Sequence, residues 1–265
     1  MDPGILCFHH CDHKVFCTII PEKCPVCQQK LDRYDYNLLP FRVPYPFVKA
    51  SQHPRAIVMK PTHGDFLNDY YNSKDLHIGV TNSQGCVVEF SEEGIRGVDP
   101  MTKKWSNCDS SAEWDQCLLL EQFDELWNEL WDGILLKVMI IFSSPLWEAD
   151  RYNEERHNCF TFVLAFLRAL DCGELSEKAR DPKLFCKQYV VPRTSAAGKY
   201  ISLYRQLKRI YYNRKQHCSD KTSGIAYLHR VMRCLINIHF KLKDLLNCNK
   251  ILIYNFILGG SNSKH

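Results

Sequence analysis

A histidine and a cysteine in the middle of the chain have the surroundings that nucleophilic catalysis by a thiol requires. Cys159 directly follows Asn158 at the start of a long apolar run, which predicts a capped helix with Cys159 in its first turn. Free amides and the helix dipole at that position stabilise a thiolate and can donate to an oxyanion. His77 is the candidate base. Glu89, on the paired strand of a predicted hairpin, is the candidate that orients its imidazole.

Each of these residues also has a purely structural interpretation. His77 could be a strand histidine at the edge of a hairpin, and Cys159 one more buried thiol on an apolar helix. His157 is the other histidine near Cys159, but side chains this close together at the start of a helix generally diverge. The combination of a helix cap, a histidine and an acidic partner therefore favours His77 and Cys159 as a catalytic pair.

The first 27 residues contain a second group of reactive side chains. Five of the 14 cysteines lie there, at positions Cys7, Cys11, Cys17, Cys24 and Cys27. The last two form a C-x-x-C motif on a proline-containing turn, which can direct two thiolates to one tetrahedral Zn²⁺. A structural zinc ion needs four ligands, so we expect Cys11 as the third and either His10 or Cys17 as the fourth. The alternative is a small hydrophobic hairpin whose cysteines pack as apolar residues.

Composition is typical of a globular protein with one large or two small domains. The chain has 265 residues, of which 45% are hydrophobic and 24% charged, and this excludes intrinsic disorder. The net charge of +4 is too small to indicate nucleic-acid binding by itself. It is also uneven, because residues 211–265 carry a net charge of +7 and residues 1–210 carry −3. Nucleic acid is therefore not the expected partner.

Targeting signals are not visible in the sequence. The first residues lack the pattern of a secretory signal, and no apolar run approaches the roughly 20 residues of a membrane helix. We therefore expect an intracellular protein, cytoplasmic or nuclear, with no transmembrane segment. In a reducing compartment the cysteines should be metal ligands, buried apolar residues or reactive thiols rather than a disulfide framework.

The elements that position these residues are predicted from hydrophobic periodicity. The expected strands are 56–59, 77–81, 86–90 and 134–142. The expected helices are 113–132, 159–170 and 200–212. Residues 82–85 are expected to form a hairpin turn, and residues 184–191 a strand or extended segment that ends before Pro192. Strands and helices in this arrangement predict an α+β fold.

The residues around His77 and Cys159 resemble a group of thiol hydrolases. Residues 60–66, 77–80 and 85–90 are similar to the first half of the circularly permuted NlpC/P60 proteins, and residues 158–162 to the second half. That group includes the lecithin:retinol acyltransferase-like proteins and the PPPDE-like deubiquitinases and deSUMOylases. The resemblance implies a permuted papain-like antiparallel sheet packed on a central helix, in which the histidine precedes the cysteine in the chain.

The chain departs from that group at two positions. Phe160-Thr161 follow Cys159, where the group usually has an acidic residue or histidine before phenylalanine. Glu89 occupies the place of a third polar residue that is usually histidine or an amide. A glutamate can still orient His77, and its charge would raise the imidazole pKa and favour an ion pair with Cys159.

Ordered segments of the chain also resemble the makorin-2 opposite-strand protein family, over about residues 8–210. They are residues 10–29, 75–82, 157–159 and 189–194. No activity follows from this resemblance. With both resemblances, the expected organisation is a zinc-knuckle-like hairpin (1–30), a proline-rich linker (31–54), a permuted papain-like domain (55–210) and a basic tail, helical or poorly ordered (211–265).

Two functions are compatible with these observations. The first is a cysteine hydrolase or acyltransferase in which Cys159 attacks an acyl or isopeptide carbonyl, His77 acts as base and then acid, and Glu89 orients His77. The alternative is a catalytically inactive papain-like scaffold whose zinc knuckle makes it a protein-interaction module. Both imply a protein substrate or partner, and neither sets the oligomeric state.

Overall fold

The computed structural model describes residues 2–32, 38–71, 74–99, 105, 112–140 and 146–217. Within these residues the chain divides into two units. The N-terminal unit comprises the described parts of 2–46 and 198–217, and the sheet unit comprises those of 47–197. The long helix α5 (Val191–His217) contributes to both units.

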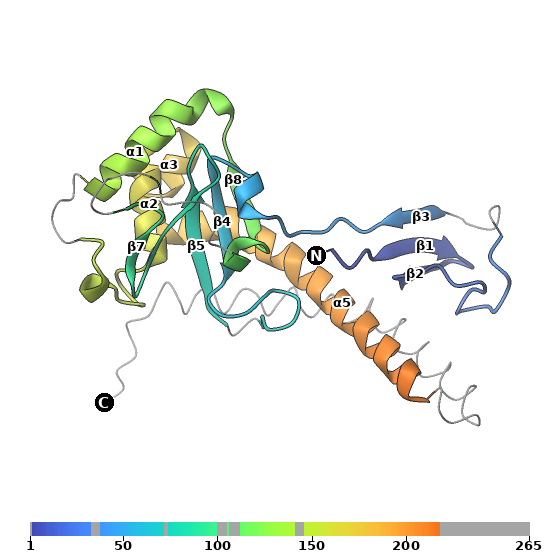
Figure 1. The fold of residues 1–265 in the computed structure, drawn as a ribbon. Coiled ribbons are helices and arrows are strands. Elements are labelled where there is room, and N and C mark those ends of the chain that lie inside the picture. Colours follow the sequence, from blue (N-terminus) through green and yellow to red (C-terminus); the bar gives the residue numbers. More distant parts are fainter. Residues whose placement is uncertain are drawn as a thin grey trace, which may run out of the picture. The chain divides into compact units, whose positions relative to one another are not determined.

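The N-terminal unit contains a three-stranded antiparallel sheet in the order β2-β1-β3 (Figure 1). Its strands are β1 (Leu6–His10), β2 (His13–Cys17) and β3 (Leu38–Arg42). Cys11 and Asp12 join β1 to β2 with φ values of 43° and 61°, as in a type I′ hairpin turn. The predicted linker, residues 31–54, contains β3. Pro40 is tolerated there because β3 lies at the edge of the sheet.

The sheet unit contains a five-stranded antiparallel sheet in the order β7-β6-β5-β4-β8. Its strands are β4 (Ala56–Pro61), β5 (Leu76–Thr81), β6 (Val87–Ser91), β7 (Gly94–Arg96) and β8 (Leu118–Gln122). The α+β class and the predicted strands at 56–59, 77–81 and 86–90 are confirmed. The predicted turn is also present, since Oδ1 of Asn82 accepts hydrogen bonds from the backbone N–H groups of Gln84 and Cys86.

Helices complete the sheet unit. The helices are α1 (Asn128–Ile140), α2 (Cys159–Leu170), α3 (Glu174–Lys178), α4 (Pro182–Phe185) and α5, with a π-helical turn, η6 (Cys186–Val190), before α5. The 3₁₀ turns are η1 (Ala50–Gln52), η3 (Ala112–Trp114), η4 (Glu125–Trp127) and η5 (Ala149–Arg151). Helix α2 packs against β5, β6 and α1, as predicted for a central buried helix (Figure 1). Its Phe166 meets Trp131 of α1 edge to face.

Three predicted elements are wrong. Residues 113–132 are not one helix, because they contain η3, β8 and the start of α1. Residues 134–140 are helical rather than extended, and the buried side chains Trp131, Leu135 and Val138 recur at helical spacing. Residues 184–191 are also helical. Pro192 has no N–H to continue the α-helical hydrogen bonding, and the backbone forms the wider π turn just before it.

The remaining expectations concern the cysteines, the tail and membranes. Cys86 is disulfide-bonded, an exception to the expected reduced state, and the other nine cysteines of the described part are free. The predicted helix at 200–212 belongs to α5, and residues 218–265 of the expected tail lie outside the described residues. In the part of the chain that the structure describes, no helix is long and apolar enough to cross a membrane.

Candidate functional site

Cys159 is the first residue of α2, and its predicted cap is present. Oδ1 of Asn158 accepts hydrogen bonds from the amides of Phe160 and Thr161 at 3.0 and 3.2 Å. The hydroxyl of Thr161 in turn accepts a hydrogen bond from the Asn158 amide, which completes a capping box. The cap thus occupies the second and third amides of the helix. The N–H of Cys159 itself has no hydrogen-bond partner among the described residues and remains free for an oxyanion.

The loop before Cys159 is held by His157. The Nε2 atom of His157 lies 2.6 Å from the carbonyl oxygen of Leu146, and its ring stacks on Trp147 with 4.9 Å between centroids. Phe90 of β6 packs edge to face against both rings. His157 is therefore engaged in fixing the start of α2, in keeping with the preference for His77 as the base.

His77 and Glu89 form a buried ion pair. The Nε2 atom of His77 lies 2.8 Å from Oε2 of Glu89, and only 8% and 9% of the two side chains are exposed. The N–H direction at Nε2 is not aligned as in an ideal hydrogen bond, so the contact is chiefly electrostatic. Since Nε2 faces the carboxylate, Nδ1 is the ring nitrogen left to face a thiol.

The surroundings of His77 place Cys159 beside it. Burial alone would lower the pKa of His77, but hydrogen bonding with Cys159 and the electrostatic attraction of Cys159 and Glu89 outweigh it and raise the pKa to about 9. Burial likewise would raise the pKa of Glu89, but His77, Lys60 and Arg96 hold it below its usual value. The structure therefore brings the three predicted residues together, and their charges favour imidazolium and carboxylate at neutral pH.

The raised pKa of His77 predicts a pH-dependent stability. The ordinary pKa is 6.5, so the stabilisation is fully present below pH 6.5 and is lost as the pH rises through about 9. We expect the free energy of unfolding of the wild type, relative to His77→Gln, to fall by at most roughly 3 kcal/mol over this window. Urea unfolding between pH 6 and 10, followed by tryptophan fluorescence, measures it. A constant difference between the two proteins would contradict the ion pair.

Further charged and aromatic side chains surround the pair. Lys60 lies opposite His77 in the β4–β5 register, and its Nζ is 3.2 Å from Glu113 and 5.3 Å from the ring centroid of Trp114. Trp114 is buried, with its ring 6.1 Å from that of His77. Arg96 reaches Glu89 at 3.6 Å. Sequence reasoning missed these residues, although the alternation of β4 and β5 could have indicated Lys60.

A second cluster lies in the N-terminal unit. One potential ligand atom each from His10, Cys11, Cys24 and Cys27 lies within 4.8 Å of all the others. The sulfurs of Cys11 and Cys24 are 3.8 Å apart, and that of Cys27 is 3.4 Å from Nδ1 of His10. A tetrahedral zinc ion with ordinary bond lengths sets its S···S and S···N edges at about 3.8 and 3.5 Å. The spacing of these four side chains fits such an ion.

The backbone around Cys24 and Cys27 forms a tight knuckle. The N–H of Val26 points at the sulfur of Cys24 at 3.4 Å, and the N–H of Gln28 donates to the Cys24 carbonyl. Gln28 has a left-handed φ of 64°, and Lys23 and Lys30 pair across the base of the knuckle. Such N–H groups offset charge on a metal-bound thiolate.

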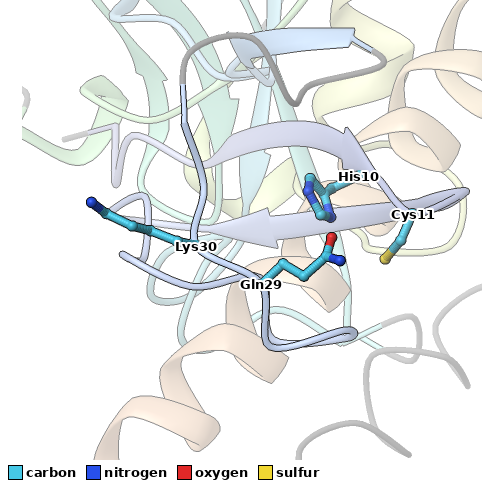
Figure 2. Close-up of a pocket in the computed structure, with 4 residues that line it drawn as sticks. All are labelled: His10, Cys11, Gln29 and Lys30. Atoms are coloured by element: carbon cyan, nitrogen blue, oxygen red, sulfur yellow. The ribbon is translucent and has the colours of Figure 1, made fainter.

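The cluster lies beside an open pocket of about 500 Å³ lined by His10, Cys11, Gln29 and Lys30. Figure 2 shows His10, Cys11 and the amide of Gln29 close together, with the Lys30 side chain directed away from them. Cys17 lies outside the cluster. It pairs with Leu6 at the far end of the hairpin, whereas His10 pairs with His13 beside the turn. The structure therefore offers His10 as the fourth ligand.

Comparison with known proteins identifies relatives over most of the chain. A family model described as DUF4796 C-terminal matches residues 40–207, and one described as DUF4796 N-terminal matches residues 3–31. The human MKRN2 opposite strand protein is 30% identical over 209 residues, which cover 77% of this chain and 86% of that protein. No solved structure matches the chain.

Proposed function

The chain belongs to the family of the MKRN2 opposite strand protein, and within this family we propose that it acts as a cysteine hydrolase or acyltransferase. One observation carries the proposal: the buried pair of His77 and Glu89 lies beside Cys159 at a capped helix start. A buried ion pair adds little to stability compared with apolar packing. Its position beside a thiol therefore favours a chemical role.

The proposed reaction begins at the sulfur of Cys159. The thiolate attacks an acyl or isopeptide carbonyl carbon, and the free Cys159 N–H stabilises the oxyanion that forms. As the C–O or C–N bond breaks, the imidazolium of His77 gives its proton to the leaving alcohol or amine, and an acyl thioester remains on Cys159.

The second step releases the acyl group. Neutral His77 takes a proton from water, or from a second acceptor, as that group attacks the thioester carbonyl. The C–S bond breaks, and the pair of thiolate and imidazolium is restored. Glu89 keeps the imidazole oriented and stabilises its charge in both steps. Water as acceptor gives a hydrolase, and another nucleophile gives an acyltransferase.

A second candidate function is an inactive scaffold that binds a protein partner through the N-terminal unit. The burial of the site favours it, because Cys159 and His77 are only 2% and 7% exposed. A substrate carbonyl must reach the sulfur before it can react. Both candidates imply a protein as substrate or partner.

The N-terminal cluster is proposed to hold a structural zinc ion. The donor set of three thiolates and one imidazole is one that zinc prefers, and the separations of the four donors support a tetrahedral site. Zinc in such a site clamps the knuckle to the β1–β2 turn. Four protein ligands would fill its coordination, which leaves no position for a substrate.

Acylation by an activated ester tests the thiol proposal. The intact protein is treated with p-nitrophenyl acetate, and the modified cysteine is located by peptide mass spectrometry. We expect acetylation at Cys159 in the wild type, none at that position in Cys159→Ala, and unchanged acetylation at Cys159 in Cys172→Ala. Cys172 is a matched control because it is the more exposed thiol, hydrogen-bonded to Ser176. Acetylation elsewhere but never at Cys159 would favour the scaffold.

A further inference from the structure

Arg96 is placed by the sheet directly opposite Glu89. The two residues are a register pair of the antiparallel β6–β7 ladder. Nη1 of Arg96 lies 3.6 Å from Oε1 of Glu89, while the other carboxylate oxygen, Oε2, faces His77 at 2.8 Å. Each oxygen of the buried carboxylate thus has its own cationic partner.

Two outer carboxylates hold the guanidinium in place. Nη2 of Arg96 is 2.7 Å from Glu93, three residues earlier across the β6–β7 turn, and Nη1 is 3.9 Å from Glu113. The Arg96 side chain is 46% exposed, so its Coulomb attraction to Glu89 is partly screened by solvent. Its cross-strand position nevertheless keeps the planar guanidinium beside Oε1 of Glu89.

We infer that Arg96 is a positioning residue of the thiol site: it anchors Oε1 of Glu89 so that Oε2 stays on His77. This inference rests on the proposed function for its catalytic consequence, but the anchoring itself is a property of the folded sheet unit. With Arg96 the proposed site has four residues, in which Cys159 contacts His77, His77 contacts Glu89, and Glu89 contacts Arg96.

Anchoring and simple charge compensation predict opposite results when Arg96 is replaced. If Arg96 only neutralises Glu89, its loss leaves a stronger carboxylate on His77, and the imidazole holds its proton more tightly. If Arg96 anchors Glu89, its loss lets the carboxylate turn toward solvent, and the imidazole loses its proton more easily. The sign of the change in His77 titration therefore separates the two roles.

Other charged groups around His77 are unchanged in this comparison. They are Cys159 of α2, which acts on His77 directly, Lys60 of β4, which acts on Glu89, Glu113 of η3 and Glu93 of the β6–β7 turn, which pair with Lys60 and Arg96, and Tyr152, whose pKa is raised to about 12 by burial and by Cys159. Cys159 acts on His77, and Lys60 on Glu89, from other elements, so removing Arg96 leaves their contributions in place.

The test is an NMR titration of the His77 imidazole in full-length wild type, Arg96→Met, Arg96→Lys and Arg180→Met. The His77 signal is assigned by its loss in His77→Gln. Arg180 is the matched control because it is an exposed arginine that follows α3, and α3 packs on α2 and α4. We expect Arg96→Met to lower the titration midpoint by about 1 pH unit, Arg96→Lys to lower it less, and Arg180→Met to leave it unchanged.

A midpoint that rises or stays constant in folded Arg96→Met would overturn the inference. If Arg96→Met does not fold, the Arg96→Lys titration decides, since it keeps the charge but not the planar contact. Acetylation of Cys159 is measured on the same samples. A lowered midpoint in a protein whose wild type is never acetylated would refute the proposed function and leave the anchoring role intact.

Discussion

Replacing His77 by alanine is expected to lower the rate of acyl transfer from an unactivated alkyl ester, whose leaving alkoxide needs a proton, by about 10²- to 10⁴-fold, the usual contribution of a general acid–base. His77 carries two roles in the proposed reaction. As an imidazolium it stabilises the Cys159 thiolate, and as an acid it protonates the leaving group. Because its pKa is raised to about 9, the protonated form that both roles need is present throughout the neutral range.

The fall of the acyl-transfer rate at alkaline pH is a second test of the role of His77. Acyl transfer in the wild type should fall as the pH rises through about 9, when His77 loses the proton that the leaving group needs. Glu89→Gln keeps the shape of the side chain but removes its charge. The fall should then begin about 1 to 3 pH units lower, since the lost carboxylate no longer favours imidazolium.

The control for these measurements is His53→Ala. His53 is a half-buried histidine of the sheet unit whose ring Nδ1 lies 2.9 Å from Oε1 of Gln122, and it is remote in sequence from Cys159. We expect its rate and pH profile to match those of the wild type. Rates of His77→Ala within a factor of two of the wild type, in a protein with normal circular dichroism, would refute the role of His77.

Removing the proposed zinc ion is expected to unfold the N-terminal unit and to leave the sheet unit folded. Structural zinc contributes about 10–16 kcal/mol of binding free energy, and the three short strands of this unit enclose a small apolar core. Cys11, Asp12 and Gln28 all have left-handed φ values, which cost roughly 1–2 kcal/mol per residue for residues other than glycine. A metal bound to the adjacent thiolates would stabilise those conformations.

Metal content and hydrogen exchange measure this effect. The purified protein should contain one zinc per chain, and a chelator that enters through the pocket at His10 and Cys11 should remove it. Backbone amides of β1 and β2 should then lose protection, while those of β4 and β5 keep it. Cys24→Ser should reproduce the loss and Cys17→Ser should bind zinc normally, because Cys17 lies at the far end of the hairpin. Equal zinc content in both variants would refute the assignment.

Local rules predicted the elements that carry His77, Glu89 and Cys159 better than they predicted the elements between them. Asparagine is a preferred N-cap residue and Asn158 precedes an apolar run, and Asn82 with Gly85 favours a turn, so α2 and the β5–β6 hairpin were predictable. The helical spacing of apolar residues led to a wrong prediction of one helix over residues 113–132. There β8 is a short strand whose leucines also fit a helical period, and its partner β4 lies about 60 residues earlier in the chain. Such distant pairing leaves no local signal.

Local sequence signals likewise could not decide between His10 and Cys17 as the candidate fourth metal ligand. Either residue is near the C-x-x-C motif in sequence, and only the hairpin register decides which end of the strands meets the knuckle. The pairing of Arg96 with Glu89 could likewise not be predicted from the sequence, because it depends on the length of the β6–β7 turn.

The N-terminal unit is made from two distant parts of the chain. The carboxylate of Asp2 contacts Arg42 at 3.0 Å and the hydroxyl of Tyr200 at 3.1 Å, and Tyr45 packs edge to face on the ring of Tyr200. During synthesis residues 2–46 leave the ribosome before the sheet unit, but their partner segment from residue 198 onward emerges only after the whole sheet unit. The N-terminal unit therefore completes its fold only after the sheet unit has been synthesised, and until then it lacks the contacts that Tyr200 makes with Asp2 and Tyr45.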